Sequence, residues 1–420
     1  MRKQFSFGQN LRVSAALVLA GVALLTLPFL EPAEAAQAKK TATKKTTAKK
    51  TTAKKTTAKK KVARSPWNVP NYADSDAADA ITGDDPIARQ AAVEALGKLN
   101  GSVVVTDADS GRILTVVGQK IAYSHGYQPC STIKVPVALA ALSESIVDRL
   151  TQIRIYGNTK IALTEALAKS NNQYFASLGE KLGFERVSYY ARLYGLGEKA
   201  SLNIEEEQAG LLPAKTPASG MGMMTSFGDG ITLTPLEYAA LVGAVANGGT
   251  LYYLQYPENE KEAEGFVPRI KRRLDIEHLV GDVKPGMMGA VEYGTARRVG
   301  FNDEAPVYGK TGTCTDTRTP THLGWFGSFT EIGHERIVVV VMLTGGSAVS
   351  GSAASNVGGQ VYKNLLTMNY YDHQQVGEPV SAGDVIGAVG DTGGHNQPAL
   401  YFEVRRGREP VNPENWLQRR

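Results

Sequence analysis

The chain has 420 residues, 42% of them hydrophobic, which is enough for two or three folded domains and excludes a fibrous or wholly disordered protein. Its 46 basic and 41 acidic residues give a formal charge of +5, but residues 39–64 alone carry twelve basic residues and no acidic one. Residues 65–420 carry 31 basic and 39 acidic residues, a net charge of −8. A protein that is basic throughout and coats nucleic acid is therefore excluded.

The first 35 residues have the parts of a secretory signal. A basic stretch ends at Arg12, an uncharged apolar run covers residues 13–30, and Ala33-Glu34-Ala35 follows as a cleavage site. We expect residues 1–35 to be a signal peptide that is cleaved after Ala35. The apolar run is also about long enough to cross a bilayer, so an uncleaved membrane anchor is the alternative. Both interpretations place the rest of the chain outside the cytoplasm, in the periplasm or cell envelope.

Residues 36–65 form a Lys/Thr/Ala-rich segment, in which Thr-Thr-Ala-Lys-Lys occurs three times in tandem over residues 46–60. Such a composition cannot bury a core, so we expect a disordered tether that its like charges keep extended. Two interpretations stay open for its role. The tether either binds anionic envelope polymers or lipid headgroups, or it is only a solvated spacer.

Residues 66–368 carry alternating helix and strand signals. A helix is predicted to begin at Asp85-Pro86, where an acidic N-cap precedes a proline at the first helical position. Strands at 102–106 and 112–117 then form a hairpin. Further helices are predicted at 135–142, 161–179, 234–246 and about 354–366, and further strands at 307–313, 323–330 and 336–343. This order predicts an α+β domain whose antiparallel sheet is built from both ends of the segment around a helical insert.

The first of three polar motifs is Ser131-Thr132-Ile133-Lys134, at the start of the apolar helix predicted at 135–142. The spacing of three residues places Ser131 and Lys134 on one helical face. A serine hydroxyl becomes an effective nucleophile when a base takes its proton, and a desolvated neutral lysine is such a base. The pattern is common by chance, so alone it indicates little.

The other two motifs are Ser170-Asn171-Asn172 and Lys310-Thr311-Gly312-Thr313. In the second motif, a hydroxyl and an amide can face one cleft if the helix breaks there. In the third, Gly312 lets a ligand backbone lie close to a strand, and Lys310 with the two hydroxyls can bind a carboxylate. A polar helix break and a strand with an edge lysine are the ordinary structural alternatives.

Taken together and in this order, S-x-x-K, S-x-N and K-T-G resemble the motifs of the penicillin-recognising serine acyl-transferases, which include penicillin-binding proteins and serine β-lactamases. The resemblance covers about residues 100–366, and it implies an antiparallel sheet with flanking helices and a helical lobe. Other stretches that resemble penicillin-binding protein transpeptidase domains are 101–105, 109–114, 164–175, 226–236, 246–249 and 294–296.

The resemblance implies a role for each motif. Ser131 is then the acylated nucleophile, Lys134 its general base, and Ser170 a relay that carries a proton to the leaving amine. The implied activity is that of a peptidoglycan D,D-transpeptidase or D,D-carboxypeptidase, which acts on D-Ala-D-Ala stem peptides and binds β-lactam antibiotics. It implies no cofactor and no metal.

The resemblance also implies how the substrate is held. Asn172 would bind a substrate amide, and the Lys310–Thr313 motif would hold the terminal carboxylate of the stem peptide. The backbone N–H groups of Ser131 and Thr313 would form an oxyanion hole.

The two cysteines adjoin the motifs, because Cys130 directly precedes Ser131 and Cys314 directly follows Thr313. An even number of cysteines in an exported chain suggests a disulfide, although the residues alone leave two buried thiols as an alternative. The placement is similar to that in disulfide-bearing class A β-lactamases. The resemblance therefore implies a Cys130–Cys314 disulfide.

A serine β-lactamase of class A-like character is the alternative function. Those enzymes are similar in using a glutamate between the second and third motifs, and Glu205-Glu206-Glu207 lies in that interval. An acidic turn is the interpretation we favour. The 140-residue interval from Ser170 to Lys310 also resembles that of a penicillin-binding protein.

Residues 369–420 differ in composition from the rest and predict a small all-β module, with short strands at 385–389 and 400–404. The module resembles part of a LytM-type zinc endopeptidase, but Ala399 and Tyr401 stand where active members carry zinc-binding histidines, so no metal site is expected. The resemblance implies a binding module or an activator of cell-wall amidases, with a vestigial packing fragment as the alternative. A wholly non-catalytic peptidoglycan-binding or amidase-activating protein is the second alternative function.

Overall fold

The structure, a computed structural model, describes residues 69–371 without 301, 303–304, 317–320 and 333–334, together with the backbone of 404–406 and 409–411. The chain divides into two units, Met1–Val62 and Ala63–Arg420, and every described residue belongs to the second. The predicted signal peptide and tether, and most of the C-terminal module, lie outside the described residues. Within the described part of the chain, none of the helices is long and apolar enough to span a membrane.

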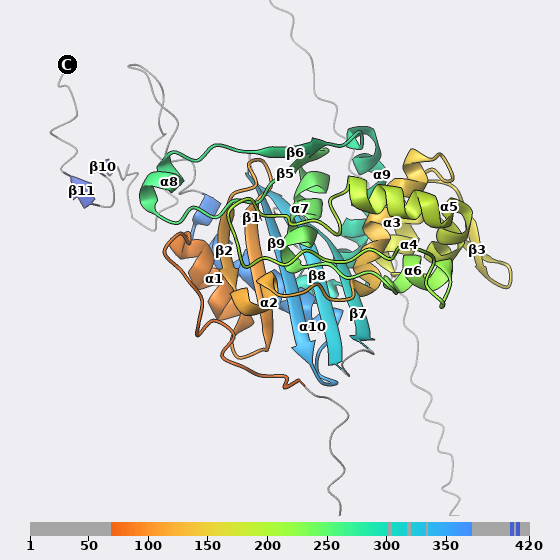
Figure 1. The fold of residues 1–420 in the computed structure, drawn as a ribbon, viewed down its shortest axis with the longest axis horizontal. Coiled ribbons are helices and arrows are strands. Elements are labelled where there is room, and N and C mark those ends of the chain that lie inside the picture. The colour runs from red at the N-terminus through yellow and green to blue at the C-terminus, as the bar shows by residue number, and fades with distance from the viewer. Residues whose placement is uncertain are drawn as a thin grey trace, which may run out of the picture. The chain divides into compact units, whose positions relative to one another are not determined.

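A five-stranded antiparallel sheet in the order β2-β1-β9-β8-β7 forms the centre of the described domain (Figure 1). Strand β1 from the start of the domain pairs with β9 from near its end. The two ends of the domain therefore meet in the sheet, and most of the chain between them forms an insert. The predicted α+β fold is thereby confirmed. The strands are β1 (Gly101–Asp107), β2 (Ile113–Val117), β7 (Val307–Asp316), β8 (Thr321–Ile332) and β9 (Glu335–Gly345).

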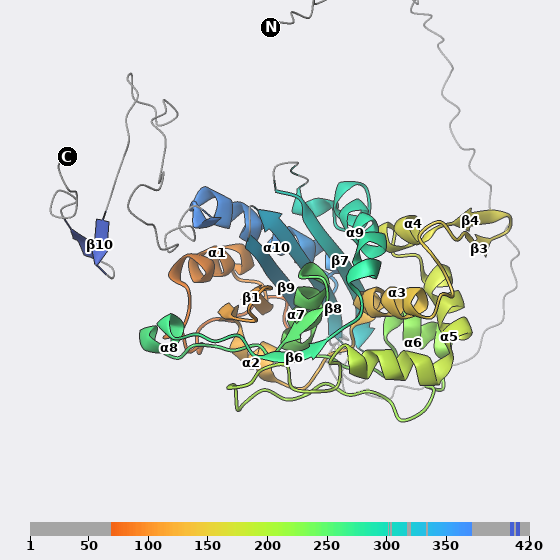
Figure 2. The same cartoon turned by 90° about the horizontal axis from the view of Figure 1, so that it is seen from above.

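Strand β9 is apolar at nearly every position because helices cover both faces of the sheet. The odd-numbered residues from Ile337 to Leu343 pack in one core cluster with α1 (Pro86–Leu96) and α10 (Gly351–Thr367). The even-numbered residues from Val338 to Met342 pack in a second cluster with α7 (Pro235–Ala246). Figure 2 shows α1 and α10 on one side of the sheet and α7 on the other.

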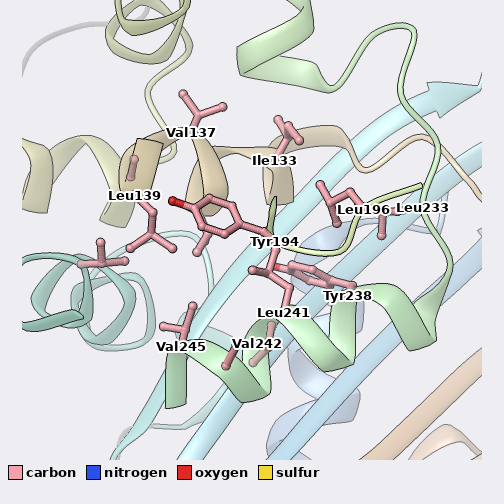
Figure 3. Close-up of a cluster of buried hydrophobic side chains, with 14 of the residues drawn as sticks. Ile133, Val137, Leu139, Tyr194, Leu196, Leu233, Tyr238, Leu241, Val242 and Val245 are labelled. Atoms are coloured by element: carbon pink, nitrogen blue, oxygen red, sulfur yellow. The ribbon is translucent and has the colours of Figure 1, made fainter. Parts of the chain in front are cut away.

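The helical insert forms a lobe beside β7, the edge strand of the sheet (Figure 1). Its apolar contact with the sheet layer runs through α3 and α7, and Figure 3 shows Tyr194 between Val137 of α3 and Leu241 of α7. The helices of the lobe are α3 (Lys134–Ser143), α4 (Leu163–Ala168), α5 (Asn172–Leu193), α6 (Met221–Phe227) and α9 (Glu277–Glu292).

Smaller elements join these layers. They are the short helices α2 (Gln119–Tyr123) and α8 (Glu260–Glu264), the hairpin of β3 (Ile153–Tyr156) with β4 (Thr159–Ile161), and the pair of β5 (Thr250–Tyr252) with β6 (Ile270–Arg273). In the C-terminal region, β10 (Val404–Arg406) pairs with β11 (Glu409–Val411). The strand predicted at 400–404 shares only its last residue with β10, and the one predicted at 385–389 lies outside the described residues.

The single helix predicted at 161–179 is wrong. Helix α4 ends at Ala168, and α5 begins at Asn172. Between them Ser170 has a φ of 54°, a left-handed conformation that is uncommon for any residue but glycine. The Asn171 side chain accepts a hydrogen bond from the Tyr174 backbone N–H and caps the second helix. This N-cap starts a new helix although the apolar periodicity of the sequence continues through the break.

Glu237 fastens two loops to helix α7. Its buried Oε1 accepts hydrogen bonds from the backbone N–H groups of Gly197, Glu198 and Gly210, at 2.9, 3.1 and 3.0 Å. Its Oε2 accepts one from the N-cap Thr234 at 2.6 Å, which completes a capping box. Four backbone donors therefore depend on one carboxylate.

Glu237→Gln should destabilise the domain, because the amide nitrogen cannot accept a hydrogen bond and leaves at least one buried N–H unpaired. Such a loss is worth about 1–3 kcal/mol. Urea unfolding measures it, with the exposed Glu180→Gln on α5 as the matched control. A free energy of unfolding equal to that of the control would contradict this role of Glu237.

Candidate active site

The first motif forms a compact turn at the entrance of helix α3. Ser131 lies on the 3₁₀ turn Cys130–Ile133, and Lys134 is the first residue of α3. The Lys134 Nζ donates a hydrogen bond to Ser131 Oγ at 2.8 Å. Cys130 adopts a φ of 54°, and such rare backbone conformations cluster at functional sites. The predicted pairing of a nucleophile with a base is therefore within proton-transfer distance.

The second motif lies at the break between α4 and α5, and the break turns its polar groups toward Lys134. The Lys134 Nζ lies 3.0 Å from the carbonyl oxygen and 3.1 Å from the Oγ of Ser170, and 2.6 Å from Asn172 Oδ1. A continuous helix at this position would not have the left-handed turn at Ser170. The structure therefore brings the first two motifs together.

The third motif reaches the same point from strand β7. The buried Lys310 Nζ donates to Ser170 Oγ at 2.8 Å and to the Thr311 carbonyl oxygen at 2.8 Å. Ser170 Oγ thus accepts hydrogen bonds from both lysines. A hydroxyl has two acceptor lone pairs and one O–H, so the proton of Ser170 stays available for donation.

Burial controls the charge of both lysines, each of which is fully shielded from solvent. It lowers the pKa of Lys134 to about 7. Burial, and after it the positive charge of Lys134, lowers the pKa of Lys310 well below its ordinary value. A lysine with a pKa near 7 has a large neutral fraction at neutral pH, so Lys134 can act as a base.

A cleft of about 920 Å³ opens over these groups. Ser131, Ser170, Asn172, Thr311 and Thr313 from the three motifs line it, whereas Lys134 and Lys310 are buried behind them. Lining residues to which the sequence motifs gave no role are Phe227, Gly294, Thr295, Arg297, Arg298, Ser350 and Ser352.

Three of these additional residues lie in stretches whose sequence resembles transpeptidase domains: Phe227 in 226–236, and Gly294 and Thr295 in 294–296. Thr295 lies in the Gly-Thr-Ala stretch at 294–296, and its Oγ1 is hydrogen-bonded to Thr311 Oγ1 at 2.6 Å. Ser350 is the N-cap of α10, and its side chain accepts from the Ala353 backbone N–H. Beside it, Thr313 Oγ1 accepts from the Gly351 N–H at 2.7 Å. Helix α10 therefore fixes the hydroxyl of Thr313.

Gly312 has a packing role that the motif alone did not indicate. A Cβ at this position would lie 2.9 Å from the Pro129 carbonyl oxygen and 3.1 Å from Thr132 Cγ2. The missing side chain thus lets β7 pack against the turn that carries Ser131. Gly312 is absent from the residues that line the cleft.

The structure contains the disulfide that the resemblance implies. Cys130 and Cys314 are bonded, with their Cα atoms 5.5 Å apart and a separation of 184 positions in the sequence. A covalent closure of this length is worth about 5 kcal/mol in the chain-entropy model. Trp325 Nε1 also donates to the Gln128 carbonyl oxygen at 2.9 Å, so strands β7 and β8 both hold the segment that leads to Ser131.

The three acidic residues at 205–207 are not among the residues that line the cleft over Ser131. Glu207 is buried and accepts hydrogen bonds from the backbone N–H groups of Ala200 and Ser201 and from Ser201 Oγ. Glu206 lines a different pocket, next to Tyr123 and Gln208. Across the residues with described placement, no group of histidine, cysteine and carboxylate side chains could hold a metal ion.

The chain is similar in sequence to curated proteins. Stage V sporulation protein D of Bacillus subtilis (strain 168) is 27% identical over 57% of this chain and 42% of its own length. Peptidoglycan D,D-transpeptidase PbpA of Mycobacterium tuberculosis (strain ATCC 25618 / H37Rv) is 28% identical over 58% of this chain and 56% of its own. The chain spans about half the length of these curated relatives.

Solved structures share the fold. PBPA from Mycobacterium tuberculosis matches with a TM-score of 0.58 at 21% identity, covering 68% of this chain and 81% of the other. The transpeptidase domain of Burkholderia pseudomallei penicillin-binding protein 3 also matches with a TM-score of 0.58, at 19% identity, covering 68% and 94%.

Two family models match the chain. The model of peptidase family M23 matches residues 340–413, which include much of the predicted C-terminal module. The model of the penicillin binding protein transpeptidase domain matches residues 101–367, which span the sheet, the helical lobe and all three motifs. The chain therefore belongs to the penicillin-binding protein transpeptidase family.

Proposed function

We propose that the protein is a peptidoglycan D,D-transpeptidase or D,D-carboxypeptidase of the cell envelope, with Ser131 as the residue acylated by D-Ala-D-Ala stem peptides and by penicillin. One observation carries the proposal: Ser170 Oγ accepts from both Lys134 and Lys310 at the edge of a cleft that Ser131 lines. The family membership and the printed names of relatives such as PbpA support it.

In the proposed acylation, neutral Lys134 takes the proton of Ser131 as Oγ attacks the carbonyl carbon of the D-Ala-D-Ala amide. The Oγ–C bond forms and the C–N bond breaks. Lys134 passes the proton to Ser170 Oγ, and Ser170 gives its own proton to the leaving amine nitrogen. The hydrogen bonds from Lys134 to both hydroxyls provide this path.

The third motif positions the substrate in two ways. The hydroxyls of Thr311 and Thr313 line the cleft and are the groups that we assign to the terminal carboxylate. Lys310 is buried and bound to Ser170 Oγ, so we assign it a positioning and electrostatic role behind these hydroxyls. Asn172 binds a substrate amide, and the N–H groups of Ser131 and Thr313 form the oxyanion hole, in which one donor is worth about 3 kcal/mol of barrier.

The cleft favours a penicillin-binding protein over a β-lactamase. A β-lactamase must activate water to hydrolyse the acyl-enzyme, and a class A enzyme does so with a carboxylate. None of the residues that line the described cleft is an aspartate or glutamate. Within the described part of the chain, a penicillin adduct on Ser131 would therefore find no carboxylate among the cleft-lining residues to activate water, and we expect it to be long-lived.

The segments outside the described residues complete the proposal. The signal at 1–35 exports the protein or anchors it, and the basic tether at 36–65 binds anionic envelope polymers. The module at 369–420 keeps a family resemblance to zinc peptidases but has Ala399 and Tyr401 at ligand positions, so we infer a binding module, with cell-wall amidases as partners.

Purified protein should form a stable one-to-one adduct with benzylpenicillin on Ser131, detectable by intact-protein and peptide mass spectrometry. Ser131→Ala should abolish the adduct, whereas Ser110→Ala, on the hairpin turn between β1 and β2, should retain it. Rapid multiple turnover of nitrocefin by the wild-type protein would refute this proposal in favour of a β-lactamase.

The rate of penicillin acylation should rise with pH through about 7 and level off above it, because only neutral Lys134 accepts the proton and its pKa lies near 7. Lys134→Arg should lower the rate by roughly a hundredfold or more, since guanidinium stays protonated. Stopped-flow acylation across this pH range tests both expectations. A rate that is independent of pH around neutrality would contradict the role of Lys134.

A further inference from the structure

Two arginines at the active-site cleft take no part in the proposed acylation. Arg297 and Arg298 form the 3₁₀ turn η2 (Arg297–Val299) with Val299, and both side chains are exposed and line the cleft over Ser131. The sequence motifs include neither of them. At this position the two arginines can contact a bound substrate.

The turn that carries the arginines is held on both sides. The preceding Thr295 is hydrogen-bonded through its Oγ1 to Thr311 Oγ1 of the third motif at 2.6 Å. On the other side, a Cβ at Gly359 of α10 would lie 2.3 Å from the Val299 carbonyl oxygen, so the helix and the turn pack backbone to backbone. The arginines are therefore mounted at a fixed place beside the proposed carboxylate site.

The two guanidinium groups bring positive charge to the lining of the cleft. Among the residues whose placement is described, neither arginine forms an ion pair, and the lining of the cleft contains no carboxylate. A cleft lined by one sign of charge attracts a ligand of the opposite sign. Guanidinium binds carboxylate in a bidentate geometry, so a carboxylate is the group that fits.

The terminal carboxylate of the substrate is already assigned to Thr311 and Thr313. The two arginines would therefore bind a different carboxylate of the substrate. We propose that Arg297 and Arg298 form a second carboxylate-binding subsite, which recognises a free carboxylate of the acyl-donor peptide upstream of its D-Ala-D-Ala terminus. This inference rests on the proposed function and specifies its substrate: an acidic stem peptide, rather than one whose upstream carboxylates are amidated.

Two synthetic acyl donors that end in D-Ala-D-Ala test the subsite. They differ only in the residue before that terminus, whose side chain carries a free carboxylate in one peptide and the corresponding amide in the other. Release of D-Ala gives kcat/KM for each. The wild-type protein should favour the carboxylate peptide by about tenfold, which corresponds to roughly 1.4 kcal/mol.

Arg297→Gln combined with Arg298→Gln should remove most of this preference, mainly through a higher KM for the carboxylate peptide. The matched control combines Arg269→Gln with Arg273→Gln, two exposed arginines that do not line the cleft, and it should keep the preference. Equal kcat/KM values for the two peptides in the wild-type protein would overturn the inference. So would a preference that persists in the Arg297 and Arg298 double variant.

Benzylpenicillin, which has a single carboxylate, separates this inference from the proposed function. If the wild-type protein is acylated by penicillin but does not discriminate between the two peptides, the subsite is refuted and the proposed acylation stands. If the wild-type protein reacts with neither penicillin nor the peptides, the proposed function is refuted and the subsite with it.

Discussion

Two buried lysines converge on one hydroxyl, Ser170 Oγ, and the arrangement of the site depends on this contact. Lys134 comes from α3 of the helical lobe and Lys310 from β7 of the sheet, so the contact joins the two halves of the domain. Desolvation disfavours both positive charges, and it is this burial that lowers the pKa of Lys134 to about 7. Because both lysines donate to Ser170 Oγ, the proton of Ser170 stays free for donation.

The contact requires that β7 stay close to the turn that carries Ser131. Three features hold it there: the Cys130–Cys314 disulfide, the missing side chain of Gly312, and the hydrogen bond from Trp325 to the Gln128 carbonyl. Together these features keep strand β7 of the sheet packed against the turn that leads into the helical lobe. A preorganised site of this kind needs little rearrangement to react.

Local signals predicted most of the fold, but only tertiary packing explains the rest. Asp85-Pro86 marked the start of α1, and the strand predicted at 336–343 lies within β9. The apolar periodicity through 161–179 concealed the break at Ser170, where a capping asparagine and a left-handed turn override it. Likewise, the motifs identified the groups around Ser131, whereas Arg297 and Arg298 belong to no motif and are placed at the cleft by the packing of η2 on α10.

The ionisation of Lys134 in the folded protein tests this account most directly. Selective ¹⁵N-lysine labelling and NMR titration of the uncomplexed domain follow the side-chain amine, and the Lys134 signal is assigned by its loss in Lys134→Arg. We expect a midpoint near 7, far below the ordinary value of 10.5, because burial opposes the charged form. A Lys134 that stays protonated up to about pH 10, as an exposed lysine does, would contradict the account.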